Sequence, residues 1–343
     1  MLGSFRGFRG LALLSALIYC GTNPAPAAAE AKKVVVAKAG NFLAWGLIDI
    51  AKAKGFFANR GLDVEILMAQ GGPQVLAAVL AGRADFSTTS VLELIEANSQ
   101  GQNAKIVSPL IQQSQVACAV RADLVSQFPA ASAPWTERVK ALRGKRVGVT
   151  SVGGGVSLTL NYMLKGAGLA DSDVAQTAIG ADPAAWVAAM RTKQLDAMCA
   201  GIPIPEATIV QGTTELFVSP ALGDVPPLAG IPDATVVTSQ ATIDRDPDKV
   251  QAFVAGLFDA MKLMHDDPQQ CAAILKQEVF TNLDQKTFDL GFRDFSKAFA
   301  VTPRITEDQF GKALDYASFI KGKEVKFKLT DLYDGRFAQA LQQ

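Results

Sequence analysis

The sequence has almost no histidine: His265 stands alone among 343 residues. Imidazole is the commonest zinc ligand and the base of Ser-His-Asp triads, so this scarcity argues against a histidine-rich metal site and against such a triad. An excess of charge is also missing, because 33 Lys and Arg balance 33 Asp and Glu. That balance argues against a nucleic-acid-binding or polybasic membrane-binding protein. We expect no metal, no cofactor and no nucleic-acid partner.

Cysteine is scarce and scattered. Cys118 and Cys199 lie in separate apolar runs, Cys271 opens an alanine-rich stretch, and no two cysteines form a CxxC motif. This spacing fits neither a zinc site nor a disulfide-rich scaffold. We interpret the three as small buried apolar side chains and do not expect a disulfide.

The first thirty residues resemble an export signal. Arg6 and Arg9 precede the apolar residues 11–19, and small residues follow at 24–29. This order is typical of a secretory signal peptide, and the apolar run is shorter than the roughly 20 residues of a membrane span. We predict a signal peptide at residues 1–29 and a periplasmic mature protein. Lipid attachment at Cys20 is the alternative, although Tyr19 stands where a small residue is usual.

The rest of the chain alternates between strand and helix patterns. Residues 33–37 are valine-rich and residues 61–67 alternate, as strands do, and a helix pattern from Pro73 ends at Gly82. The pattern restarts at residues 142–149. Such alternation predicts an α/β fold with parallel sheets. The C-terminal third is mostly helical, and we expect it to support the first half.

Two capping boxes and one weak internal repeat refine this prediction. Ser90 with Glu93, and Thr306 with Gln309, have the spacing that begins a helix. Residues 78–85 and 189–196 each read as a helix end, a turn and a strand led by Asp. The repeat suggests two similar halves, although a match this loose also arises from the pattern that all α/β folds share.

An ordered set of short motifs covers nearly all of the predicted mature chain. It comprises AKGFF at 53–57, GLDV at 61–64, GG at 71–72, AGRADF at 81–86, LRGKRVGV at 142–149, AGL at 167–169, LDA at 195–197 and DLYD at 331–334. In this order the motifs resemble the NMT1/THI5-like substrate-binding proteins of ABC importers, of the nitrate, sulfonate and taurine type. Lys193 is a departure, because that family usually has glycine there.

The resemblance implies a type II periplasmic-binding-protein fold, in which two α/β lobes are joined by two crossing strands. We expect the crossings near residues 117–121 and 231–236. The first lobe would comprise residues 30–118 and 232–343, and the second residues 119–231. The protein is expected to be a monomer that delivers a small organic anion or related molecule, similar to a sulfonate, nitrate or taurine, to an ABC permease in the inner membrane.

The ligand is expected between the lobes, where strands end and helices begin, because unpaired backbone N–H groups gather there. The candidate ligand-binding residues of the first lobe are Asn41, Phe42, Trp45, Gly71, Gly72, Thr88 and Thr89. Those of the second lobe are Ser151, Gly153, Gly154, Gly155, Asp182 and Pro203.

Plainer roles compete at several of these positions. Ser90 is expected to cap a helix, and Asp182, which precedes a proline, favours the same role over ligand contact. Glu206 is interpreted as a solvated acid in the first turn of a helix. The three glycines at 153–155 lack the Gly-Lys-Ser/Thr of a P-loop and the Gly-x-Gly-x-x-Gly spacing, so nucleotide binding is disfavoured.

The alternative function is an exported or pathway enzyme on the same fold, such as one of pyrimidine-precursor synthesis or the menaquinone pathway. We find no nucleophile–base pair in the sequence. His265 stands beside Asp266 and Asp267 at an expected helix end, and the cysteines are scattered. The sequence therefore favours a binding protein, with no catalytic residues.

Overall fold

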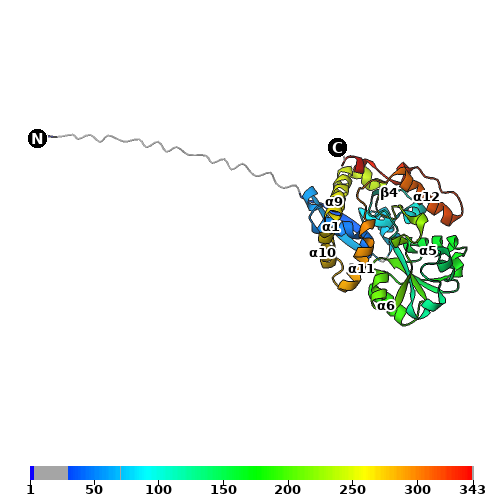
Figure 1. Cartoon of the computed structure of the whole chain (residues 1–343). Coiled ribbons are helices and arrows are strands. Elements are labelled where there is room, and N and C mark those ends of the chain that lie inside the picture. Colours follow the sequence, from blue (N-terminus) through cyan, green and yellow to red (C-terminus); the bar gives the residue numbers. More distant parts are fainter. Residues whose placement is uncertain (4–29, 70, 342–343) are drawn as a thin grey trace. The chain divides into compact units, whose positions relative to one another are not determined.

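The computed structural model describes residues 1–3, 30–69 and 71–341 (Figure 1). The chain divides into two units, Met1–Glu30 and Ala31–Gln343, and the helices and strands described below belong to the second. Residues 4–29 of the predicted signal peptide, Cys20 included, lie outside the described residues.

The first sheet has five strands in the order β2-β1-β3-β10-β4. β1 pairs in parallel with β2 and β3, whereas β10 runs antiparallel to β3 and β4. The strands are β1 (Lys32–Ala39), β2 (Leu62–Ala69), β3 (Phe86–Ser90), β4 (Ala104–Pro109) and β10 (Ala234–Ser239). The helices between them are α1 (Gly46–Ala53), α2 (Gly72–Leu80) and α3 (Val91–Ser99), and α8 (Gln240–Arg245) follows β10.

The second sheet repeats this arrangement in the order β7-β6-β8-β5-β9, with β5 antiparallel to both neighbours. Its strands are β5 (Val116–Arg121), β6 (Arg146–Val149), β7 (Ala175–Ala178), β8 (Ala197–Gly201) and β9 (Thr214–Val218). Its helices are α4 (Trp135–Lys140), α5 (Gly155–Gly166), α6 (Pro183–Arg191) and α7 (Ile204–Val210). Short 3-10 helices lie at Leu43–Trp45 (η1), Ala58–Arg60 (η2), Ala122–Gln127 (η3), Asp171–Asp173 (η4), Pro220–Leu222 (η5), Pro226–Leu228 (η6) and Ser296–Ala298 (η7).

The chain passes between the sheets twice, at residues 110–115 and 219–233. β5 and β10 follow these passages, and each joins the sheet of the lobe that it enters. The predicted two-lobed α/β fold of the type II periplasmic-binding proteins is confirmed. We call the elements around the first sheet the first lobe and those around the second sheet the second lobe.

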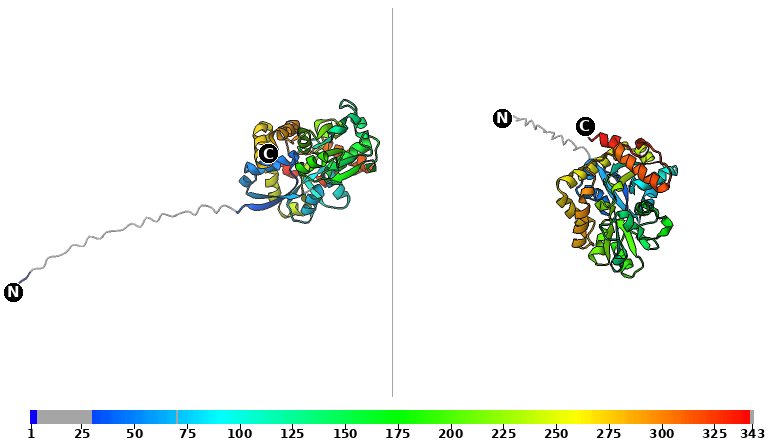
Figure 2. Two further views of the ribbon diagram at one scale, coloured as in Figure 1. Left: turned by 90° about the horizontal axis from the view of Figure 1, so that it is seen from below. Right: turned by 45° about the vertical axis from the view of Figure 1, so that its right-hand side comes forward.

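The C-terminal helices pack against both lobes. The sequence predicted that they support the first lobe only. α9 (Pro247–Asp266) and α10 (Pro268–Glu278) pack on α1, whereas α11 (Gln285–Phe295) contacts α7 of the second lobe. α12 (Glu307–Lys321) packs between α3 and α5, where the Tyr316 hydroxyl donates to Oγ1 of Thr159 at 2.8 Å. Figures 1 and 2 show α9–α11 and α12 on opposite sides of the fold. The described chain ends with α13 (Leu329–Leu332) and α14 (Arg336–Gln339).

The predicted helix starts are confirmed at their hydrogen bonds. Ser90 Oγ accepts the Leu92 N–H, and the Glu93 carboxylate accepts the Ser90 N–H. Thr306 and Gln309 form the same reciprocal pair at the start of α12. These caps are local, so the spacing of a few residues suffices to predict them.

The prediction of three unbridged cysteines is wrong. Cys118 and Cys199 form a disulfide, and Cys271 is free and buried. Cys118 of β5 lies directly opposite Cys199 of β8, with their Cα atoms 4.1 Å apart. Because 81 residues separate the two, only the strand register brings them together, and local spacing carries no sign of it.

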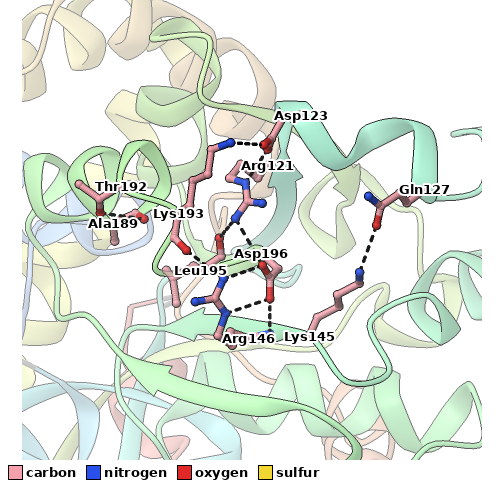
Figure 3. A network of polar contacts seen from close by, with 10 residues as sticks. All are labelled: Arg121, Asp123, Gln127, Lys145, Arg146, Ala189, Thr192, Lys193, Leu195 and Asp196. Carbon is pink, nitrogen blue, oxygen red and sulfur yellow. Dashed lines mark hydrogen bonds and ion pairs between the residues drawn. The ribbon is translucent and has the colours of Figure 1, made fainter.

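The weak internal repeat corresponds to a shared structural device. Asp85 precedes β3 and accepts the backbone N–H of Val35 in β1, and Asp196 precedes β8 and accepts that of Arg146 in β6. The turns before them also match, because Gly82 and Lys193 both have positive φ angles, +68° and +59°. Arg121 and Arg146 hold Asp196 from two sides, and Lys193 pairs with Asp123 (Figure 3). This network lies where β6 and β8 begin, at the edge opposite the candidate site.

Candidate functional site

A small cavity lies between the lobes, where strands of both sheets end. Its volume is about 40 Å³. The first lobe contributes the end of β1, η1, β3 and the starts of α2 and α3. The second lobe contributes the end of β6 and the start of α5. The lining residues are Ala39, Phe42, Trp45, Gly71, Gly72, Thr88, Ser90, Glu93, Gln115, Thr150, Ser151, Gly155 and Val156.

The structure brings seven of the thirteen predicted site residues together in this cavity. They are Phe42, Trp45, Gly71, Gly72, Thr88, Ser151 and Gly155. Asn41 and Asp182 instead line a larger pocket of about 400 Å³, between the loop after β1 and the start of α6. Asp182 also caps α6, since its Oδ1 accepts the Ala184 N–H at 3.0 Å. Ligand contact by these residues stays a prediction.

The other four predicted residues do not line either pocket. Thr89 is fully buried in β3, where its hydroxyl pairs with that of Ser87 at 2.9 Å. Pro203 follows a cis peptide bond and packs beside Gly291 of α11. Gly153 lies in the turn before α5, and Gly154 is the N-cap residue of that helix.

The sequence predicts only a helix cap at Glu93, yet the Glu93 carboxylate forms a hydrogen bond between the two lobes. Oε2 accepts the Ser90 N–H at 3.0 Å, and Oε1 accepts the N–H of Gly155 at the start of α5, at 2.7 Å. The residue is 8% exposed, and this burial, with the nearby Asp233, raises the pKa of Glu93 to about 7. The capping box was the one available signal, and it says nothing of the bond to Gly155.

The glycine at position 72 makes room for this carboxylate. A Cβ atom added there would lie 2.1 Å from both oxygens of Glu93. That separation is far inside van der Waals contact, so any side chain at position 72 would displace Glu93. The predicted Gly71-Gly72 pair thus has a physical role in the cavity. At Gly72 the backbone lies close to the Glu93 side chain, where the prediction had a ligand.

Two residues of the cavity lining each carry a buried polar atom without a partner. Oε1 of Gln115 and Oγ1 of Thr150 are buried, and neither has a hydrogen-bond partner among the described residues. Asp233 lies behind them, accepting from the Gln115 N–H and from the Ser90 hydroxyl, and burial raises its pKa to about 6. Unpartnered buried polar atoms are costly, at roughly 1–3 kcal/mol each, and are common where a ligand binds.

A family model described as NMT1/THI5 like matches residues 46–271, which is more than half of the chain. The chain belongs to this family. No curated protein matches the sequence.

Three solved structures show the same fold as this NMT1/THI5-like protein. A protein of Bordetella bronchiseptica RB50 has a TM-score of 0.80 at 23% identity, covering 91% of this chain and 97% of its own. The alkanesulfonate-binding protein SsuA of Xanthomonas axonopodis pv. citri, bound to MOPS, has a TM-score of 0.69 at 18% identity, covering 88% and 96%. The desulfurization enzyme DSZB has a TM-score of 0.65 at 14% identity, covering 90% and 98%. The fold therefore occurs in binding proteins and in an enzyme.

The expectation that Glu206 is solvated is wrong for this NMT1/THI5-like chain. Glu206 is 4% exposed, and its Oε2 has no hydrogen-bond partner among the described residues. Burial, with Asp294 nearby, raises the pKa of Glu206 to about 7. The reason is tertiary: α11 packs against α7 and covers the first turn, where a helix pattern alone predicts a free acid.

The described part of the chain has no group of three His, Cys, Asp or Glu placed to hold a metal ion. Within that part, no helix is both long enough and apolar enough to cross a membrane.

Proposed function

We propose that this chain is the solute-binding component of an ABC importer, and that it holds a small molecule between its lobes. Membership of the NMT1/THI5-like family and the two-lobed fold support this role. The observation that carries the proposal is the cavity itself, which takes its lining from the C-terminal ends of strands in both lobes. Open α/β sheets bind ligands at these ends.

Export to the periplasm is part of the proposal. The charged, apolar and small segments of residues 1–29 support a signal peptide. The Cys118–Cys199 disulfide adds support, because disulfides persist in oxidising compartments such as the periplasm. The permease would be the inner-membrane partner, and the binding protein would act as a monomer.

The ligand proposed from the sequence is a small molecule similar to a sulfonate, nitrate or taurine. SsuA, which has the same fold, is an alkanesulfonate-binding protein. Of these three classes, the amine-bearing, taurine-like molecules match the cavity best, because Glu93 places a carboxylate in it. The support for an enzyme function is the fold alone, which the desulfurization enzyme DSZB shares.

Recovery of the natural ligand tests the function. Protein purified from the periplasm is denatured, and the released small molecules are identified by mass spectrometry. The molecule is then added back to stripped protein in stoichiometric amount and recovered. We expect it to bind and to return chemically unchanged. A converted product would contradict a transport role.

A pair of glycine variants tests where this molecule binds. Gly72→Ala forces the Glu93 carboxylate to move and should abolish binding of the recovered molecule in calorimetry. Gly311→Ala is the matched control, because a Cβ at position 311 of α12 meets nothing within 4 Å. Binding that survives Gly72→Ala unchanged would place the ligand elsewhere.

A further inference from the structure

Two residues in the lining of the interlobe cavity carry polar atoms without a partner. Gln115 is 8% exposed and Thr150 is 7% exposed, and each has one buried oxygen with no hydrogen-bond partner among the described residues. An amide oxygen only accepts hydrogen bonds, whereas a hydroxyl can donate or accept. Neither oxygen is open to the cavity as it stands. Turned toward an occupant, Gln115 would supply an acceptor and Thr150 an acceptor or a donor.

The Glu93 carboxylate adds further acceptor sites. Each of its oxygens accepts one backbone N–H, from Ser90 and from Gly155. A carboxylate has about four lone-pair sites, so roughly two remain for a ligand. Both of the remaining sites belong to a group that lines the cavity.

Glu93 is built into this position and is not a loose side chain. Its bond to Ser90 is half of the capping box that begins α3, so moving the carboxylate would uncap the helix. Gly72 leaves the space that the carboxylate fills. The start of α5, which could otherwise attract an anion, already donates its Gly155 N–H to Glu93.

Positive charge to hold an anion is missing from the lining. Among the described residues that line the cavity there is no Lys, Arg or His. Lys38 is buried at the end of β1, but it pairs with Asp49 at 2.7 Å. The Trp45 indole N–H, another potential donor, is directed to the carbonyl oxygen of Ala39 at 3.4 Å.

We propose that the cavity recognises a ligand through an N–H donor group, cationic or strongly polarised, that binds Glu93. The group belongs to an amine, an amidine or an amino-substituted heterocycle. Phe42 and Trp45 add aromatic faces, which favour cations. A bare anion such as nitrate or a simple sulfonate would face the carboxylate. This inference rests on the proposed function, since it concerns the same site.

A set of isosteric probes separates head-group charge from shape. Acetamidinium, acetamide and acetate each have four heavy atoms, which suits a cavity of about 40 Å³. Their binding is measured by thermal shift and by ligand-observed NMR, at matched ionic strength, in a buffer free of amines and sulfonates. We expect acetamidinium to bind and to stabilise the protein, acetamide to do so less, and acetate not at all.

Two matched variants identify Glu93 as the receptor. Glu93→Gln keeps a residue that can complete the capping box but removes the charge, and it should weaken acetamidinium binding about tenfold or more. Glu65→Gln removes the same charge from an exposed position on β2 and should leave binding unchanged. If Glu93→Gln does not fold, Gly72→Ala, which displaces the Glu93 carboxylate, should also weaken acetamidinium binding.

The results distinguish this inference from the proposed function. The inference is overturned if acetate binds as tightly as acetamidinium, or if acetamidinium does not bind. It is also overturned if the Glu93→Gln variant binds acetamidinium with unchanged affinity. If the molecule recovered from the periplasm then still binds and returns unchanged, the solute-binding role stands without it. If no recovered molecule binds, the proposed function itself fails.

Discussion

At the scale of single residues, the Glu93 carboxylate accepts two hydrogen bonds whose donors lie far apart in the sequence. Glu93 caps the helix on which it stands and also accepts an N–H from Gly155, 62 positions later. The first bond follows from the spacing of three positions between Ser90 and Glu93, and the second depends on how the lobes meet. Gly72 belongs to the same arrangement, because only a residue without Cβ leaves room for the carboxylate.

Two alanine substitutions with open space around them should have opposite effects. At Gly82 the backbone has φ +68°, which costs a residue with Cβ roughly 1–2 kcal/mol, so Gly82→Ala should lower the free energy of unfolding by about 1 kcal/mol. At Gly311, inside α12, Gly311→Ala should raise it by about 0.5–1 kcal/mol. Urea denaturation measures both. If both substitutions changed the free energy of unfolding equally and in the same direction, backbone conformation would not explain the effect at Gly82 and Gly311.

Lys193 already carries a side chain at a position with a positive φ angle, as Gly82→Ala would. It has φ +59° where the family usually has glycine, and the turn keeps the same left-handed conformation. Its side chain pairs with Asp123, and its carbonyl oxygen accepts a hydrogen bond from Arg146 (Figure 3). The departure noted in the sequence therefore changes the residue and leaves the turn intact.

At the scale of secondary-structure elements, the sequence predicts what is local. The strands, helices and caps follow from periodicity and short spacings, as Ser90, Asp182 and Thr306 illustrate. The candidate site was predicted in part, because strand ends and helix starts can be located in a sequence. Contacts between distant elements could not be predicted: the Cys118–Cys199 bridge, the cover of α11 over Glu206 and the bond from Glu93 to Gly155 all depend on packing.

The disulfide between β5 and β8 gives a direct test of that packing. Protein without its signal peptide, denatured without reductant, should show one reactive thiol, that of Cys271, and three after reduction. Replacing both Cys118 and Cys199 by alanine should lower the free energy of unfolding by about 4 kcal/mol, because the bridge closes a loop of about 80 residues. Three thiols before reduction would contradict the disulfide between Cys118 and Cys199.

At the scale of the whole molecule, the described chain buries several acids whose pKa values are raised. Glu93 and Glu206 have pKa values of about 7, and Asp233 of about 6, each mainly because of burial. The ordinary pKa values of these side chains are 4.5 for glutamate and 3.8 for aspartate. The folded protein therefore binds protons more tightly than the unfolded chain, so its stability falls as the pH rises between these values.

We expect the free energy of unfolding to be higher at pH 5.5 than at pH 8, by a few kcal/mol, on the scale of about 1.4 kcal/mol for each pKa unit. Urea denaturation at the two pH values measures it. Asp196, with its pKa lowered to about 2, contributes only at more acidic pH and does not interfere. Glu206→Gln should reduce the difference, whereas Glu65→Gln should not. Stability that is constant or rises with pH would contradict the burial of these acids.

The central claim for the molecule is that a ligand binds in the cavity between its two lobes. Trp45 lines that cavity, whereas Trp186 is buried behind β6, beside Gly148, and Trp135 packs on Gly166 of α5. The most direct test is tryptophan emission, measured as the molecule recovered from the protein is added back to stripped protein. We predict a change in emission that Trp45→Phe removes and Trp135→Phe keeps, while calorimetry shows that both variants still bind. A change that persists in Trp45→Phe, or tight binding without any change, would contradict a ligand site between the lobes.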